Sequence, residues 1–204
     1  MMSATTSIPT TLLSRVHKAA GGASPATKIT TVVFGTLFFT LCAKINVPVW
    51  PVPVTMQSFA IAAFVAAFGL RIGMASVSLY LLQGAAGLPV FAAGGGAAYL
   101  LGPTGGFLIG FVLMAAIIGF AVDRGAKGKF LPLFCSMIAG NVALLAFGFV
   151  GLVAFSGAAG WVDQTNVLGS AFAGAVQPFI VWEGIKMALA ALTVAGMAKL
   201  LARA

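Results

Sequence analysis

The chain has 204 residues, of which 61% are apolar and only 7% are charged, and its mean hydropathy is +1.11. Soluble globular domains carry about 25% charged residues, so this composition excludes a soluble domain and predicts an integral membrane protein. Eleven basic and three acidic residues give a net charge of +8. Most basic residues lie in short gaps between apolar runs, where they set membrane topology, so nucleic acid is not an expected partner.

Long apolar runs without period-2 alternation predict helices rather than a β-barrel. Residues 1–26 are rich in Ser, Thr, Ala, Gly and Pro and are predicted to be a flexible cytoplasmic tail. Residues 27–204 are predicted to form a single all-α domain of six transmembrane helices. The predicted spans cover about residues 27–43, 55–70, 72–86, 105–122, 130–155 and 169–201.

The loops that connect these spans differ in composition. Residues 46–57 contain three prolines, which predict an extended loop. Residues 87–104 are rich in glycine and bounded by prolines. A polar loop with Trp161 and Asp163 precedes the last span. We expect these irregular loops to be extracytoplasmic.

Six spans place both termini on one side of the membrane. Nine of the eleven basic residues then share that side: Arg15, Lys18, Lys28, Arg71, Arg124, Lys127, Lys129, Lys199 and Arg203. The positive-inside rule makes it the cytoplasmic side, which predicts a multi-pass protein of the bacterial plasma membrane with cytoplasmic termini.

Cysteine and histidine give no sign of metal or redox chemistry. Cys42 and Cys135 are isolated in apolar runs, which favours packing roles, and His17 stands alone in the polar tail. We therefore expect neither a metal nor a cofactor.

The most informative pair is Glu183 and Lys186, in a stretch that is otherwise apolar from 167 to 197. Charged side chains at membrane depth cost about 2.5–3.5 kcal/mol each and mark functional sites by default. Opposite charges three residues apart share one helix face, so they can neutralise one another and address a common cavity. We favour a ligand site over a purely structural ion pair.

Two further segments offer polar groups at the predicted extracytoplasmic ends of the spans. Thr55 and Gln57 open the second span; Gln57 carries both a donor and an acceptor, whereas Thr55 can equally cap the helix. In the glycine loop, Gly94 and Gly95 can let bare main-chain N–H groups approach a compact ligand. Tight helix packing suits the glycines from 105 to 110 better.

Taken together, four segments resemble the BioY family, the biotin-specific S-components of energy-coupling factor (ECF) transporters. They are Pro-Val-Thr-Met-Gln at 53–57, Gly-Leu-Pro-Val-Phe-Ala at 87–92, Gly-Pro-Thr-Gly-Gly at 102–106 and the acid-x-x-Lys pattern of the last span. The resemblance extends over about residues 27–201. One departure concerns the acid, which is typically Asp in the family and is Glu183 here; its longer side chain could shift the geometry of the pocket.

The resemblance implies a biotin site. Glu183 would accept from an N–H of the ureido ring, and Lys186 would donate to the ureido oxygen or neutralise the carboxylate. Phe91, Tyr99 and Trp182 would cover the apolar ring if their faces point inward.

The resemblance also implies partners: a transmembrane coupling protein and two cytoplasmic ATPase subunits. Thr36 and Thr40, four residues apart on the first span, would give a close approach to the coupling protein. A stand-alone secondary carrier for biotin or a related vitamin is the alternative. An intramembrane enzyme is a remote one, since no Ser/His, paired Asp or His-rich cluster is found.

Overall fold

The computed structural model describes residues 24–155, 160 and 162–203. The predicted tail lies outside these residues except for 24–26, of which Ser24 caps the first helix and residues 25 and 26 belong to it. Helix α2 spans Pro25–Lys44, and its N-cap Ser24 accepts a hydrogen bond from the main-chain N–H of Thr27 at 3.2 Å. Proline suits the first helical position, where its missing N–H has no partner to lose. The helix therefore begins two residues before the predicted span.

Beyond α2, the regular secondary structure of the described residues is helical apart from one short β ribbon. Two-residue strands β1 (Asn46–Val47) and β2 (Val54–Thr55) pair antiparallel within the predicted proline loop. The helices that follow are α3 (Gln57–Phe68), α4 (Leu70–Ala85), α5 (Ala97–Leu100), α6 (Gly105–Ala121), the π-type turn η1 (Val122–Ala126), α7 (Phe130–Ala154), α9 (Val167–Ala175) and α10 (Ile180–Arg203).

Four stretches of the described chain are long and apolar enough to cross a membrane: Pro25–Lys44, Gly105–Ala126, Phe130–Ala154 and Val167–Leu201. Helices α3 and α4 are shorter, at 12 and 16 residues. The predicted all-helical membrane architecture is thus present.

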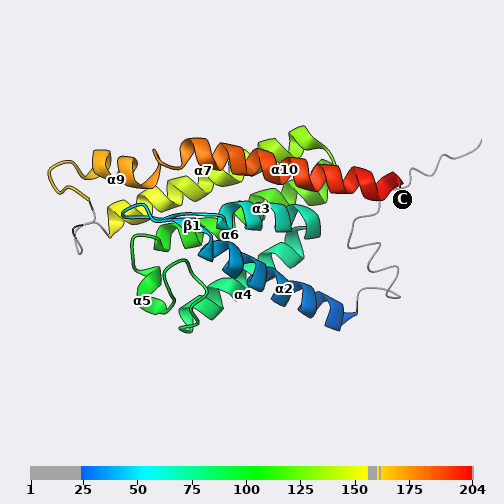
Figure 1. Cartoon of the computed structure of the whole chain (residues 1–204), viewed down its shortest axis with the longest axis horizontal. Coiled ribbons are helices and arrows are strands. Elements are labelled where there is room, and N and C mark those ends of the chain that lie inside the picture. The colour runs from blue at the N-terminus through cyan, green and yellow to red at the C-terminus, as the bar shows by residue number, and fades with distance from the viewer. Residues whose placement is uncertain (1–23, 156–159, 161, 204) are drawn as a thin grey trace, which may run out of the picture.

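Helices α6 and α7 pack closely against one another. A Cβ added at Gly110 would lie 2.9 Å from the Cα of Leu144, and one at Gly106 would overlap the main-chain oxygen of Phe147. Glycine at these positions lets the two backbones approach, as the sequence predicted for residues 106 and 110. Helix α10 lies along α3 and α7, and α2 lies along α4 (Figure 1).

The irregular segments gather at one end of the molecule. Figure 1 shows the β ribbon, α5 and α9 toward one end, whereas the start of α2 and the end of α10 both lie toward the other. The loops that sequence patterns singled out are therefore neighbours in space.

Candidate ligand-binding site

The predicted sixth span is interrupted at residues 176–179, and this break positions the key acid. Pro178 lacks an N–H and disfavours helical geometry in the residue before it. Helix α9 ends at Ala175 and α10 starts at Ile180, which places Glu183 in the first turn of α10. The partial positive charge at a helix N-terminus stabilises a carboxylate there.

Glu183 and Lys186 form a buried ion pair, as their spacing predicted. They are 3% and 6% exposed, and the Lys186 ammonium donates to Glu183 Oε1. It also donates to the main-chain oxygen of Thr55 at 2.8 Å and to the Ser58 hydroxyl at 3.0 Å. An ammonium has three donors, so the protein itself occupies all of them. Lys186 is held as a counter-charge and has no donor left for a ligand.

The carboxylate of Glu183 is only half satisfied. Its Oε1 accepts from Lys186 and from the Ser58 hydroxyl, the latter at 3.0 Å. Its Oε2 is buried and has no hydrogen-bond partner among the residues that the structure describes. A buried unpaired acceptor costs about 1–3 kcal/mol, so this oxygen is poised for a donor from outside the chain.

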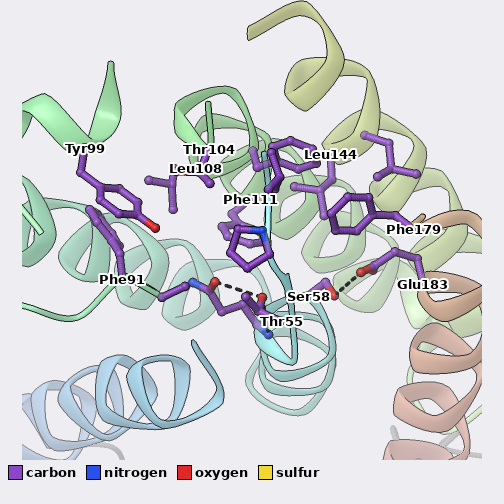
Figure 2. Close-up of a pocket in the computed structure, with 16 residues that line it drawn as sticks. Thr55, Ser58, Phe91, Tyr99, Thr104, Leu108, Phe111, Leu144, Phe179 and Glu183 are labelled. Carbon is purple, nitrogen blue, oxygen red and sulfur yellow. Dashed lines mark hydrogen bonds between the residues drawn. The ribbon is translucent and has the colours of Figure 1, made fainter. Parts of the chain in front are cut away.

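Glu183 faces a largely apolar cavity that encloses about 500 Å³ of space, including the part open to the outside. Aromatic rings form much of its wall, as Figure 2 shows for Phe91, Tyr99, Phe111 and Phe179. Apolar walls with a few polar groups are usual for small-molecule sites.

Gln57 lines the same cavity from the start of α3 and is itself fixed by neighbours. Its Nε2 donates to the Tyr80 hydroxyl at 2.6 Å, and its Oε1 accepts from the Thr55 hydroxyl at 3.1 Å. The Tyr80 hydroxyl in turn donates to the main-chain oxygen of Val90 at 3.0 Å. An amide has two N–H groups and two lone pairs, so Gln57 keeps capacity for a ligand while linking α3, α4 and the glycine loop.

The glycine loop is anchored by Phe91, which is fully buried. Its ring lies 5.4 Å from that of Tyr80 and 5.1 Å from that of Tyr99, and it packs over Gly84. Lys44, at the end of α2, donates to its main-chain oxygen at 2.6 Å. Phe91 and Tyr99 thereby hold one wall of the cavity in place.

The loop glycines have a different role from the one expected. The N–H of Gly94 donates to the oxygen of Phe91 at 3.4 Å, and that of Gly96 donates to the oxygen of Gly84 at 2.7 Å. A Cβ at Gly95 would overlap the main-chain oxygen of Leu88. Neither Gly94 nor Gly95 lines the cavity. The hydrogen bonds of Gly94 and Gly96 fold the loop upon itself, outside the cavity wall.

Trp182 also lies elsewhere than expected. It is 59% exposed and is not part of the cavity wall. Consecutive helical residues are rotated by about 100°, so with Glu183 directed inward its neighbour Trp182 points out of the bundle.

Thr36 is 1% exposed, and its hydroxyl donates to the main-chain oxygen of Val33 at 2.9 Å. Thr40 is half-buried and donates to the oxygen of Thr36 at 2.8 Å. This face of α2 is turned inward, so the structure does not support Thr36 as a surface contact for a partner.

Sequence reasoning named five of the sixteen wall residues and missed the others, among them Ser58, Thr104 and Phe179. Ser58 directly follows Gln57, and its polarity within an apolar helix was a usable signal. Thr104 stands in the Gly-Pro-Thr-Gly-Gly segment, whose polar member can be recognised from the sequence. Phe179 carried no signal, because its inward direction depends on the break at Pro178.

Comparison with known families gives a match along nearly the whole chain: the family model described as "BioY family" matches residues 11–203. The chain belongs to the BioY family. The resemblance drawn from the loop segments and the Glu183–Lys186 pattern is therefore confirmed.

Individual BioY relatives and a solved structure agree with this assignment. The chain is 33% identical over 171 residues to "Biotin transporter BioY2" of Lactococcus lactis subsp. cremoris, covering 83% of this chain and 88% of the relative. It is 35% identical over 159 residues to "Biotin transporter BioY" of Thermotoga maritima, covering 78% and 88%. It also superposes with a TM-score of 0.71 on the crystal structure of "the S-component for biotin from an ECF-type ABC transporter", at 25% identity, covering 87% of this chain and 95% of that one.

Proposed function

We propose that this BioY chain is the biotin-binding S-component of a biotin uptake transporter. The names of its relatives and of the matching solved structure support biotin as the ligand. The chain is then a transport protein rather than an enzyme. A transmembrane coupling protein and two cytoplasmic ATPase subunits would supply the energy, in keeping with the ECF type of the structural match.

The observation that carries the proposal is the unpaired Oε2 of Glu183 in the wall of an apolar cavity. Biotin has two ureido N–H donors next to an apolar thioether ring. One N–H can donate to Oε2, and the ring can lie between the aromatic side chains. Because the donors of Lys186 are engaged, we assign the ureido contact to Glu183 and treat Lys186 as the residue that holds its charge.

The remaining site residues take supporting roles in this proposal. Gln57 supplies a second polar contact, and Thr55 fixes Gln57 by its hydroxyl and Lys186 by its main-chain oxygen. Phe91 and Tyr99 cover the apolar ring.

We further propose that the chain crosses the membrane six times, with α3 and α4 as the two short crossings. The basic residues support this arrangement, because they stand at or beside helix ends and turns: Lys28, Arg71, Arg124, Lys127, Lys129 and Lys199. The positive-inside rule assigns their end to the cytoplasm and the cavity loops to the outside.

Binding to the purified chain in detergent tests the proposed ligand. Biotin should bind tightly without any ATPase subunit present, whereas thiamine and riboflavin should not compete. Tight binding of another vitamin together with no binding of biotin would refute the proposal. The orientation is tested with single cysteines introduced at residues 71 and 163 and labelled by a reagent that does not cross the membrane. The cysteine at 163 should be labelled in intact cells, and the cysteine at 71 only after the cells are opened.

A further inference from the structure

The start of α4 packs against the end of α6. The main-chain N–H of Leu70 donates to Asp123 Oδ1 at 3.4 Å, and a Cβ added at Gly119 would lie 2.7 Å from the Cα of Leu70. Arg71 directly follows Leu70, and Arg124 directly follows Asp123. The fold therefore places two arginines, from different helical elements, beside one contact.

These two arginines have charge and donors to spare. Both are exposed, and neither has a hydrogen bond or an ion pair among the residues that the structure describes. Asp123 is the acid beside them, and its charge also acts on the neighbouring Lys127. The Lys127 ammonium donates to the main-chain oxygen of Ala67 at 2.7 Å. One negative and three positive charges thus leave this region positive.

Arg124 is directed back along α6 towards apolar surface. Its guanidinium carbon lies 3.6 Å from the centre of the Phe120 ring, and Phe120 is 49% exposed. Phe120 belongs to the stretch Gly105–Ala126, which is long and apolar enough to cross a membrane. The ring attracts the cation and so holds the guanidinium at the edge of the apolar surface. At the end of a membrane span, this is the level of the lipid headgroups.

An anionic phospholipid matches this surface in both of its parts. Guanidinium groups bind phosphate oxygens through paired N–H donors, and basic clusters beside membrane spans bind anionic lipids. The exposed ring of Phe120 offers apolar contact to an acyl chain. Free inorganic phosphate would use the arginines but would gain nothing from the ring.

We propose that Arg71 and Arg124 bind the headgroup phosphate of an anionic phospholipid whose acyl chain lies along Phe120. The site is separate from the cavity and independent of the ligand bound there. The topology proposed above places it in the cytoplasmic leaflet. Because the two arginines belong to α4 and to the turn after α6, the bound headgroup joins these elements.

A second pair of basic residues supplies the matched control. Lys129 and Lys199 are also exposed. A Cβ added at Gly128 would lie 3.5 Å from the Cβ of Ala198, so these lysines flank the contact between the turn after η1 and α10. In the described part of the chain, neither lysine lies over an aromatic ring. The lysine pair therefore reports on diffuse surface charge.

The test uses the purified full chain in mixed micelles that contain a fluorescent phosphatidylglycerol. Unlabelled phosphatidylglycerol or phosphatidylcholine, with identical acyl chains, competes for the protein. The unmodified chain should prefer phosphatidylglycerol by about 10-fold or more, since each arginine near a membrane surface contributes about 5-fold. Arg71→Gln and Arg124→Gln should each reduce the preference by about 5-fold, and Phe120→Leu by about 3-fold.

The control variants and a second ligand complete the experiment. Lys129→Gln and Lys199→Gln should change the lipid preference by less than about 2-fold, because neither lysine contacts the proposed headgroup. Biotin affinity, measured on the same samples, should be unchanged in every variant, which shows that the proteins are folded. A chain that prefers phosphatidylglycerol but does not bind biotin supports the lipid site and overturns the proposed function alone.

Four outcomes overturn the lipid site. The first is equal binding of the two lipids by the unmodified chain, which does not depend on whether any variant folds. The second is an equal loss in the arginine and lysine variants, which indicates diffuse charge. The third is displacement of the labelled lipid by inorganic phosphate alone. The last is an unchanged lipid preference in the arginine variants together with lost co-purification of the coupling and ATPase subunits, which assigns the arginines to a protein contact.

Discussion

The ammonium of Lys186 on α10 lies 3.0 Å from the hydroxyl of Ser58 on α3, and that hydroxyl donates to Glu183 at 3.0 Å. A serine from another helix thus sits inside the ion pair. Lys186 also reaches the main-chain oxygen of Thr55. The pair is consequently part of the contact between α3 and α10, and its loss should affect both folding and binding.

Lys186→Met should destabilise the protein strongly. It leaves the buried Glu183 carboxylate without its counter-charge, and breaking a buried pair in this way typically costs about 3–5 kcal/mol. Biotin affinity should also fall, because Lys186 and Ser58 hold the Glu183 carboxylate in place through its Oε1. Lys199→Met, at an exposed position of the same helix, is the matched control and should leave both quantities unchanged. Melting temperature and equilibrium binding on the same samples measure both effects.

Glu183→Gln separates a ligand contact from a structural one. It keeps the shape and one acceptor oxygen but loses the charge, so biotin binding should weaken by about 2–5 kcal/mol. Glu183→Asp restores the acid typical of the family and should bind within about tenfold of the parent, which corresponds to about 1.4 kcal/mol. If Glu183→Gln lowered stability but left the affinity of the folded fraction unchanged, Glu183 would have no direct contact with biotin.

Tyr80→Phe tests the link between the helices and the glycine loop. The change removes the hydroxyl that accepts from Gln57 and donates to Val90, and each buried group left unpaired costs about 1–3 kcal/mol. We expect a lower melting temperature and faster biotin release, since the wall formed by Phe91 loses a support. Tyr99→Phe is the control: among the residues that the structure describes, the Tyr99 hydroxyl makes a single hydrogen bond, which it accepts from the N–H of Ala93 at 3.4 Å. Equal release rates in the two variants would show that the link does not hold the wall.

Gly84→Ala should displace the loop that Phe91 anchors. A Cβ at residue 84 would overlap the Phe91 ring, whereas one at Gly184, also in a helix, meets open space. Overpacking of this kind typically costs about 1–3 kcal/mol, which exceeds the gain of up to about 1 kcal/mol from replacing a helical glycine. Gly84→Ala should therefore lower stability and biotin affinity, whereas Gly184→Ala should be neutral or stabilising. Unchanged binding in Gly84→Ala would mean that the loop adapts without cost.

The turn after η1 predicts a pH effect at the other end of the molecule. Lys127 donates to the main-chain oxygen of Ala67, near the end of α3, at 2.7 Å. Burial lowers the pKa of Lys127 below its ordinary 10.5, and Asp123 opposes this only in part. In the range between the lowered pKa and 10.5 the unfolded chain binds more protons than the folded one, so stability should rise with pH there. Lys127→Met should flatten this rise in pH-dependent thermal unfolding, and Lys129→Met, at an exposed neighbouring position, should preserve it.

The sequence alone determined the membrane class, most of the helical stretches and the family. Apolar runs of sufficient length can satisfy their backbone groups in a membrane only as helices, and proline and glycine marked the irregular connections. The spacing of Glu183 and Lys186 also sufficed for the ion pair, because residues three apart share one face of a helix wherever it packs.

The tertiary structure decided which face of each helix points inward. These helices are apolar on nearly all sides, so no amphipathic stripe distinguishes the core face from the outer face. For this reason the sequence could not place Thr36 inside, Trp182 outside or Ser58 within the ion pair. Contacts between distant segments, such as Lys186 with Thr55 and Lys44 with Phe91, depend on the packing of whole helices. Thr104 likewise could be assigned to the cavity wall only from the packing of α6.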